Sequence, residues 1–422
     1  MILDKRTIRE NYLTLIKDEW LAAPDTFPDF LTPIQLNTKA QNEQYILTVS
    51  DGFQALIKSF PARIKDRENW KKKLEGMLEN VLCEETIIGV HDVMDRQTLA
   101  AFQDELKDFL RHVRAFAPEL SMEGIGQAVR NYTVYMMFAQ IHQVKQGFSP
   151  ACFGYSMLYP FTDNYIDSQN YSVSDKAEYN HIIRDKIIGE EVHPQSQHQL
   201  KTCELLGMIE SEYPRELDST VYPRGSDAKV YMLLLMMLEA QEESIRQQSK
   251  EEALTLSDRL DISIYKGGIS VLIDRFFVNR EITDADLTFY LGFGFFLQLA
   301  DDLQDIKEDS VKGHQTILTL DTSCVQEEKI VNKLLHFVQQ ITESYPAEND
   351  SFKNFVLSNC FQLIYSSIIG SKEYFSTEYL ERMEGLFPVS YQFLEKMNRN
   401  RIDNKDIKIQ KRYMKILDEM IR

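Results

Sequence analysis

The segment LTFYLGFGFFLQLADDLQDIKED, residues 287–309, is almost entirely apolar at its start and strongly acidic at its end. Upstream of it, Thr283 followed three residues later by Asp286 is a helix-start signature, because the threonine hydroxyl caps free N–H groups and the acid favours the helix dipole. The apolar part, residues 287–300, is too short to span a bilayer. The pattern therefore predicts a long, buried core helix over residues 284–307.

One face of this helix changes from apolar to acidic along its length. Residues spaced three and four apart share a helix face, and here they are Leu287, Leu291, Gly294, Gln298, Asp301 and Asp305. Asp301 and Asp305 are one turn apart and can share a hard cation through oxygen ligands. Asp302 belongs to the same acidic wall but points about 100° away, so it is expected to act as an outer acceptor around the metal ligands.

The apolar part of the stripe predicts where a substrate lies. Gly294, two turns before the acids, is expected to leave an unfilled space that suits a hydrocarbon chain. Gln298 lies between that space and the acids, so we expect both residues to contact substrate.

A second acidic pair occurs in FTDNYID, residues 161–167, where Asp163 and Asp167 are again one turn apart and follow an apolar and aromatic run. A single such pair is typical of a solvated helix face in an acidic chain. Two pairs that face each other across a bundle can hold several Mg²⁺ ions, because Mg²⁺ takes few protein ligands and completes its shell with water and phosphate oxygens. The combination predicts a magnesium site that grips a diphosphate and stabilises it as a leaving group.

The third element is ISIYKGGISVLID, residues 262–274, in which Lys266 interrupts an apolar helix and precedes two glycines. Small neighbours let a lysine approach an anion closely, and the glycines are expected to let the helix bend there. Lys266 is therefore the predicted diphosphate-binding cation. A further prediction is that the loop with Lys307, Lys312 and His314 folds over the mouth of the site, where Lys312 contacts substrate.

The rest of the chain indicates an all-α protein. Only 12 prolines and 17 glycines punctuate 422 residues, too few for a many-stranded sheet. We predict a single large helical bundle over residues 121–422, with an N-terminal helical extension over residues 1–120 packed on it. Helical periodicity covers residues 66–82, 95–116, 151–167, 227–248, 252–277, 284–307, 325–345 and 352–369. Prolines flank these runs: Pro24, Pro28 and Pro33 precede the first run, and Pro194, Pro214 and Pro223 lie between the runs 151–167 and 227–248.

The net charge of −18 argues against nucleic acid and anionic lipid as partners, because both are polyanions. An acidic protein with a diphosphate substrate needs divalent cations, so Mg²⁺ is the expected cofactor.

We predict a cytoplasmic protein without a transmembrane segment. The five cysteines are scattered, and the start MILDKRTIREN has no apolar signal region. The sequence leaves the oligomeric state open, with a homodimer as one option.

Two further features are expected to carry no chemistry. His193 and His198 have no cysteine partner at zinc-site spacing, so both are predicted to be surface residues. The apolar run of residues 231–243 predicts core. Its acidic end, with Glu239, Glu242 and Glu243, is expected to be solvated, and the alternative is that it reaches the site.

The motifs resemble those of a known enzyme class. QLADDLQDIKED with the upstream YKGG resembles the second aspartate-rich region and the Tyr-Lys segment of trans-prenyl diphosphate synthases, and DNYID resembles their first motif. The pattern is also similar to squalene and phytoene synthases. It most resembles the bacterial large-terpene synthases of the tetraprenyl-β-curcumene synthase type, the class I family of sesterterpene, triterpene and sesquarterpene synthases.

The resemblance covers about residues 150–320 and implies a class I helical bundle with a central cavity. Carried over by position, it implies that Lys266 contacts the diphosphate and that magnesium is held by Asp163, Asp167, Asp301, Asp302 and Asp305. It also implies a long all-trans polyprenyl diphosphate as substrate, in the C25 to C35 range, such as geranylfarnesyl diphosphate. The product would be a linear β-prene, of the β-geranylfarnesene type, or a monocyclic hydrocarbon. The proton acceptor would be the released diphosphate or a tyrosine such as Tyr165 or Tyr265.

Departures from neighbouring families separate the alternatives. Chain-elongating prenyltransferases have an arginine pair soon after the first motif, whereas here no arginine follows DNYID until Arg184, which disfavours condensation. A head-to-head synthase of the squalene type would need a reductive NADPH step, for which the sequence offers no sign. A non-catalytic helical protein that binds isoprenoids is the alternative of another class.

Overall fold

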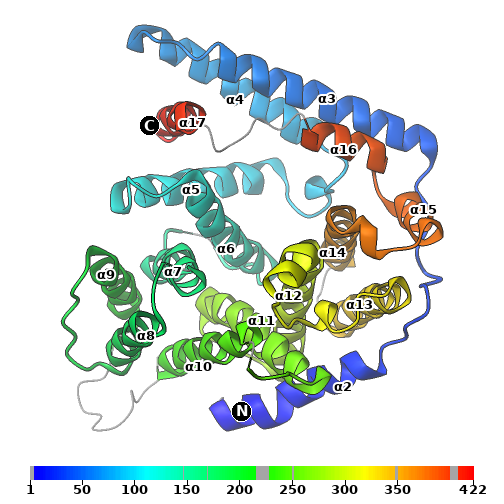
Figure 1. Ribbon diagram of the computed structural model, residues 1–422. Helices are drawn as coiled ribbons and strands as arrows, with labels where there is room; N and C mark the ends of the chain where they lie inside the picture. Colours follow the sequence, from blue (N-terminus) through cyan, green and yellow to red (C-terminus); the bar gives the residue numbers. More distant parts are fainter. Residues whose placement is uncertain are drawn as a thin grey trace.

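The computed structural model describes residues 4–422 except 146, 169, 215–227, 250, 347–349 and 400–406. All regular structure in these residues is helical, with no strand among them, and the helices pack as a single bundle (Figure 1). The all-α prediction is confirmed. In the described part of the chain, no helix is long and apolar enough to cross a membrane.

Each of the eight helices expected from periodicity is present, with ends close to those predicted. They are α4 (Arg67–Glu84), α5 (Arg96–Phe116), α7 (Pro150–Asp167), α10 (Ala228–Ser244), α11 (Leu256–Asn279), α12 (Asp284–Lys312), α13 (Cys324–Ser344) and α14 (Asp350–Gly370). The largest difference is at α12, which ends at Lys312, five residues later than residue 307. Helix α11 begins four residues later than residue 252, because Thr255 and Asp258 cap it reciprocally. Pro223 lies outside the described residues.

The remaining helices were not predicted. They are α1 (Lys5–Thr7), α2 (Leu13–Ala22), α3 (Leu36–Lys58), α6 (Met122–Ile141), α8 (Val173–Ile188), α9 (Gln197–Glu212), α15 (Thr377–Leu386), α16 (Tyr391–Arg399) and α17 (Ile407–Met420). Short π or 3₁₀ segments are η1 (Ile8–Tyr12), η2 (Ile64–Asp66), η3 (Val90–Asp92), η4 (Ile245–Gln248), η5 (Ile317–Thr319) and η6 (Lys372–Tyr374). Helix α3 illustrates why periodicity missed some of them, because it buries little apolar surface and Lys39 is its one fully buried residue.

The centre of the bundle is the antiparallel pair α11 and α12, with α13 and α14 on one side and α6, α7 and α10 on the other (Figure 1). Glycines let the two helices approach each other closely. A Cβ built on Gly294 would lie 2.1 Å from the carbonyl oxygen of Gly267, and one on Gly267 would lie 2.4 Å from the carbonyl oxygen of Gly294. The prediction of an unfilled space for a hydrocarbon chain beside Gly294 is therefore wrong, because the backbone of α11 fills that space.

The YKGG glycines have the same packing role. A Cβ on Gly268 would meet Leu291 of α12 at 3.0 Å, and α11 runs unbroken from Leu256 to Asn279. The expectation that these glycines bend the helix at Lys266 is therefore not met. They allow α11 to lie against α12.

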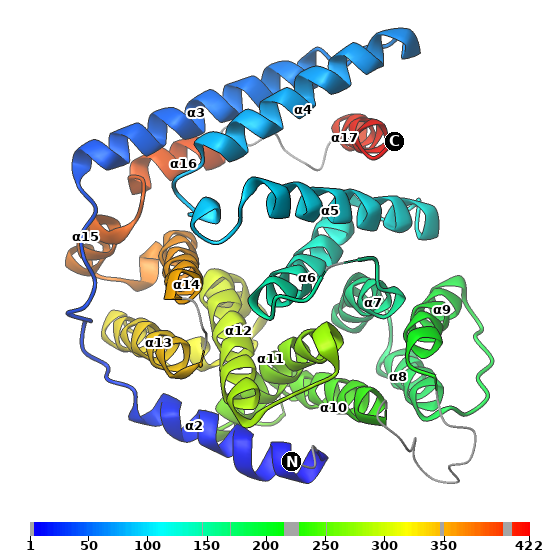
Figure 2. The ribbon, with the colours of Figure 1, turned by 180° about the vertical axis from the view of Figure 1, so that it is seen from behind.

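The first 120 residues contact the bundle in two different ways. Helix α2 contributes to the main core, where Trp20 packs edge-on against Phe295 at 5.3 Å between ring centroids. Helices α3 and α4 instead form the hairpin seen from behind in Figure 2, with a small separate core in which Trp70 and Leu74 pack with Ile416 of α17. A domain boundary near residue 120 stays a prediction.

One buried carboxyl of the core has no compensating partner. Glu327, in the first turn of α13, has 0% of its surface exposed, and neither carboxyl oxygen has a hydrogen-bond partner among the described residues. Burial, reinforced by Asp321, raises the pKa of this carboxyl to about 8. Glu327 is therefore neutral in the folded protein at neutral pH.

We expect Gly294→Ala to destabilise the protein by about 2–4 kcal/mol, because the added methyl group would push α11 and α12 apart. The measurement is the free energy of unfolding in urea. Gly126→Ala is the matched control, since an added Cβ there meets no atom within 4 Å. This substitution should stabilise α6 by about 0.5–1 kcal/mol, because alanine favours a helix more than glycine does. Similar effects of the two substitutions would contradict the packing role of Gly294.

Glu327 should also make stability depend on pH. Its pKa is raised in the folded state, so the stability that its protonated form contributes is lost as the pH rises from about 4.5 to about 8. Over that window its contribution to the free energy of unfolding should fall by about 1.4 kcal/mol per pH unit. Glu327→Gln should remove this slope and stabilise the protein at pH 8, as measured by urea unfolding at several pH values. An unchanged slope in the variant would show that Glu327 is not its source.

Candidate active site

The acidic stripe of α12 is longer than expected from the sequence. Asp301 and Asp305 are exposed, and Asp309, one turn further on, is half-buried. Burial, followed by the charges of Asp301 and Asp309, raises the pKa of Asp305 to about 6. Asp309 was missed by sequence reasoning, although its four-residue spacing from Asp305 was the signal that could have identified it. These three carboxylates form one line, which we call the α12 acidic stripe.

Asp302 faces the interior and not solvent. It is 6% exposed, and its Oδ1 atom accepts a hydrogen bond of 2.8 Å from Nε2 of Gln298. Its Oδ2 atom is buried without a hydrogen-bond partner among the described residues. Burial raises the pKa of Asp302 to about 8, whereas the nearby charge of Lys266 acts to lower it. The structure thus brings Lys266, Gln298 and Asp302 together at the interface of α11 and α12.

The loop after α12 lies beside the acidic stripe. His314 Nδ1 lies 3.0 Å from the carboxylate of Asp309, and Lys312, which pairs with Glu308, acts to lower the pKa of Asp305. Lys307 instead pairs with Glu373 at 2.9 Å. The expected loop is wrong for both lysines, because α12 continues to Lys312 and only His314 lies after the helix. Lys312 and His314 lie at the stripe, whereas Lys307 points to η6.

The first acidic motif occupies the end of α7, which Ser149 caps at its start. Asp163 is half-buried, and its Oδ1 atom accepts a hydrogen bond of 2.7 Å from Nε2 of Gln241 on α10. The neighbouring Asn164 points elsewhere and exchanges amide hydrogen bonds with Gln127 of α6, at 3.0 and 3.3 Å. The side chain of Asp167 lies outside the described residues.

The acidic end of α10, residues 239–243, is not freely solvated as the sequence suggested. Glu239 contacts Lys5 at 2.6 Å and Arg9 at 3.7 Å, and it accepts a hydrogen bond of 3.1 Å from the hydroxyl of Tyr265. Arg9 also pairs with Glu243 at 2.8 Å, and its guanidinium lies 4.6 Å from the centre of the Tyr265 ring. The start of the chain therefore neutralises this end of α10.

Two more contacts hold the same part of α10. Glu242 pairs with Arg184 of α8 at 2.6 Å. In η4, which continues α10, the carbonyl oxygen of Gln247 accepts a hydrogen bond of 2.8 Å from the backbone N–H of Gln315, in the loop after α12. Helix α10 is thus the element that connects the first acidic motif to the region of the α12 acidic stripe.

The two tyrosines proposed as bases are both engaged by neighbours. The Tyr165 ring stacks on Tyr171 at 3.8 Å and on His198 at 5.0 Å between centroids. Burial raises the pKa of both Tyr165 and Tyr265.

The prediction that His198 is a surface residue is wrong, because its ring nitrogen lies 2.8 Å from the carbonyl oxygen of Phe161 and the side chain is half-buried. His193 is exposed as expected.

The described residues contain no group of three or more His, Cys, Asp or Glu side chains arranged to hold a metal ion. Two carboxylates suffice for Mg²⁺, which takes one or two of them together with water and phosphate oxygens. The pair Asp301 and Asp305 meets that requirement. A clamp in which both acidic motifs share the metal ions stays a prediction.

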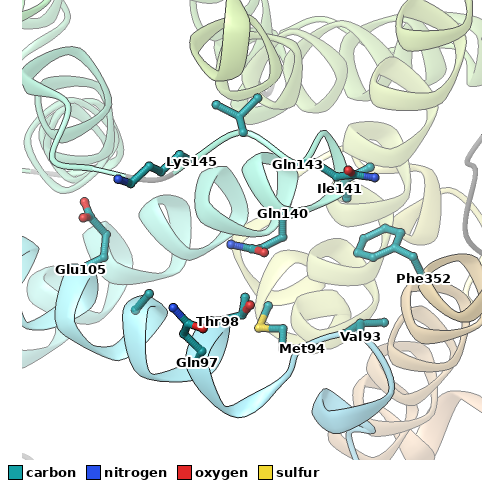
Figure 3. A pocket seen from close by; sticks show the side chains of 12 residues that line it. Val93, Met94, Gln97, Thr98, Glu105, Gln140, Ile141, Gln143, Lys145 and Phe352 are labelled. Carbon is teal, nitrogen blue, oxygen red and sulfur yellow. The ribbon is translucent and has the colours of Figure 1, made fainter.

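A cavity of about 590 Å³ lies apart from both acidic motifs, between α5, α6 and α14. Glu105 and Lys145 lie at one end of it and Phe352 at the other (Figure 3). Side-chain amides of Gln97, Gln140 and Gln143 line its walls. Its mixed polar lining differs from the apolar surface that a hydrocarbon chain requires.

Comparisons with family models and with curated proteins find no match to this chain. The likeness to class I terpene synthases therefore depends on the motifs within residues 150–320. What those motifs imply about activity is a proposal.

Proposed function

We propose that this protein is a magnesium-dependent class I terpene synthase. It would ionise a long all-trans polyprenyl diphosphate and release a linear or monocyclic hydrocarbon together with diphosphate. The observation that carries the proposal is the α12 acidic stripe, which ends an apolar helix and has Lys312 beside it, while Lys266 lies near the adjacent, buried Asp302. Acids and lysines at one helix end are the groups that recognise a metal-bound diphosphate.

The electrostatics of the stripe support a cation ligand. The pKa of Asp305 is raised first by burial and then by the charges of Asp301 and Asp309, so the carboxylates of the stripe repel one another in the protein alone. The acidic end of α10 differs, because Lys5, Arg9 and Arg184 already neutralise it. Of these two acidic surfaces, the stripe is the one whose charge a divalent cation would compensate.

Mg²⁺ would be held by Asp301 and Asp305, with Asp163 and Asp167 as the proposed second pair. When bound, the metal supplies positive charge to the diphosphate oxygens. Lys312 beside the stripe and Lys266 beside Asp302 would add positive charge. That charge would stabilise the departing diphosphate, which gains negative charge on its leaving oxygen, more than the intact substrate ester. Asp302 is buried with Gln298, so its proposed role is to hold Lys266 near the site.

The proposed reaction breaks the C–O bond between the allylic carbon and the diphosphate, and the electron pair leaves with the oxygen. The resulting cation loses a proton, directly or after one ring closure, and the hydrocarbon forms. Because burial raises the pKa of Tyr165 and Tyr265, their phenols stay protonated and are poor proton acceptors. We therefore favour the released diphosphate as the base.

The substrate and the compartment are parts of the same proposal. Family resemblance suggests the C25 to C35 range, and the packed glycines place the hydrocarbon chain elsewhere than beside Gly294. Tyr159 is a candidate contact, since it is 42% exposed, one turn before Asp163, and directly follows residues 151–158, which are all buried. We propose the cytoplasm as the compartment, in agreement with five cysteines that are all free thiols.

Asp301→Asn should lower magnesium-dependent diphosphate release by at least about 100-fold, because the variant loses a charged metal ligand. The measurement is diphosphate release at saturating Mg²⁺, together with calorimetric binding of pyrophosphate in the presence of Mg²⁺. Asp104→Asn on α5 is the control, since that carboxylate is 80% exposed and remote from the motifs. Wild-type turnover in Asp301→Asn would refute the site, and binding without turnover in the wild-type protein would favour a non-catalytic isoprenoid-binding protein.

Chain length is tested by incubating the purified protein with C15, C20, C25, C30 and C35 all-trans diphosphates and identifying products by mass. We expect hydrocarbon products from the long substrates and no coupled or chain-elongated diphosphates. Activity confined to C15 would refute the large-terpene assignment. Longer diphosphates formed with isopentenyl diphosphate would instead identify a prenyltransferase.

A further inference from the structure

Gln241 makes a buried contact that the sequence motifs did not reveal. Its side chain is 6% exposed, and its amide Nε2 donates a hydrogen bond of 2.7 Å to Oδ1 of Asp163. The residue lies in the sequence AQEES, where Glu242 and Glu243 follow it. At the position that faces Asp163, α10 therefore presents a neutral donor.

The chemistry of an amide suits a carboxylate that has to bind a cation. A glutamate at this position would repel Asp163, and a lysine would neutralise it and compete with a metal ion. The amide N–H occupies one lone pair of Oδ1 and leaves the negative charge of Asp163 in place. Such a contact fixes the orientation of a metal ligand without removing its charge.

The structure also fixes Gln241 itself. Glu239 and Glu243 are held by the start of the chain, and Glu242 is held by Arg184 of α8. Gln247, one and a half turns later, is tied to Gln315 after α12. These ion pairs and the hydrogen bond fix the position of α10. The Gln241 amide is therefore a fixed donor, and its hydrogen bond restricts the orientation of the Asp163 carboxylate.

The second acidic motif contains the same arrangement. Gln298 donates to Oδ1 of Asp302 at 2.8 Å, as Gln241 does to Oδ1 of Asp163. In the second motif the glutamine and the aspartate lie on one helix, whereas in the first motif they come from two. The first motif thus depends on how α10 packs against α7.

We propose that Gln241 is a positioning residue that orients Asp163 for magnesium binding. This inference rests on the proposed function, because it assigns Asp163 the role of a metal ligand. It places a required residue on α10, outside both aspartate-rich motifs.

The test compares Gln241→Met, which keeps the length of the side chain but removes the donor, with Gln241→Glu, which replaces the donor by a like charge. Both should raise the Mg²⁺ concentration for half-maximal turnover about 10-fold or more. For Gln241→Met, kcat at saturating Mg²⁺ should recover to within about threefold of wild type. Affinity for Mg²⁺ and pyrophosphate, measured by calorimetry, should fall in parallel.

Gln127→Leu is the matched control, because it removes a glutamine contact to Asn164, the neighbouring residue of the same motif. It should leave the Mg²⁺ dependence within twofold of wild type. Thermal unfolding followed by circular dichroism checks that each variant is folded, and the Glu variant serves if the Met variant is not.

The outcomes separate the two proposals. Folded Gln241 variants with wild-type Mg²⁺ dependence and wild-type pyrophosphate affinity would overturn the role of Gln241 and leave the terpene synthase proposal standing. A wild-type protein with neither magnesium-dependent turnover nor magnesium-dependent pyrophosphate binding would overturn the proposed function, and the positioning role with it. A loss of Mg²⁺ affinity in both Gln241 variants but not in Gln127→Leu would support the inference.

Discussion

The contact between the backbones of Gly267 and Gly294 is the constraint on which the centre of this bundle depends. Side chains at either position would separate α11 from α12, because each Cβ would overlap a carbonyl oxygen of the other helix. The close approach places Lys266, the residue before the first of these glycines, beside Asp302. The close packing at the two glycines therefore also determines the chemistry of the site, because it brings the charged side chains of α11 and α12 together.

The distribution of charge adds a second constraint. The chain carries a net charge of −18, yet its two conspicuous acidic surfaces differ. The end of α10 is neutralised by lysine and arginine from the start of the chain and from α8, so it acts as a structural junction. In the α12 acidic stripe, burial and then the charges of Asp301 and Asp309 raise the pKa of Asp305. Similar residue types therefore have different surroundings. The glutamates of α10 form direct ion pairs with basic residues of other elements, whereas Asp305 lies beside Asp301 and Asp309, and the nearby Lys312 pairs with Glu308.

Much of the helical core could be predicted because its signals are local. Apolar spacing located α12 and α7, and the capping pair Thr283 and Asp286 marked the start of α12. Helices that bury little, such as α3, gave a weak period and were missed. Within the site, Asp301 and Asp305 followed from spacing, whereas Asp309 was missed. Gln241 had no sequence signal, since its significance comes from a partner 78 residues away on another helix.

The sequence by itself determined the all-α class, the acidic motifs and their places near helix ends, because these depend on residues within a few turns of one another. Only the tertiary structure decided that Gly294 packs against a backbone and not against a ligand, and that Asp302 is buried. It also decided that Glu239 and Glu243 pair with the start of the chain. The reason is physical, because each of these outcomes depends on which distant side chain or backbone occupies the adjacent space, and no local spacing encodes that.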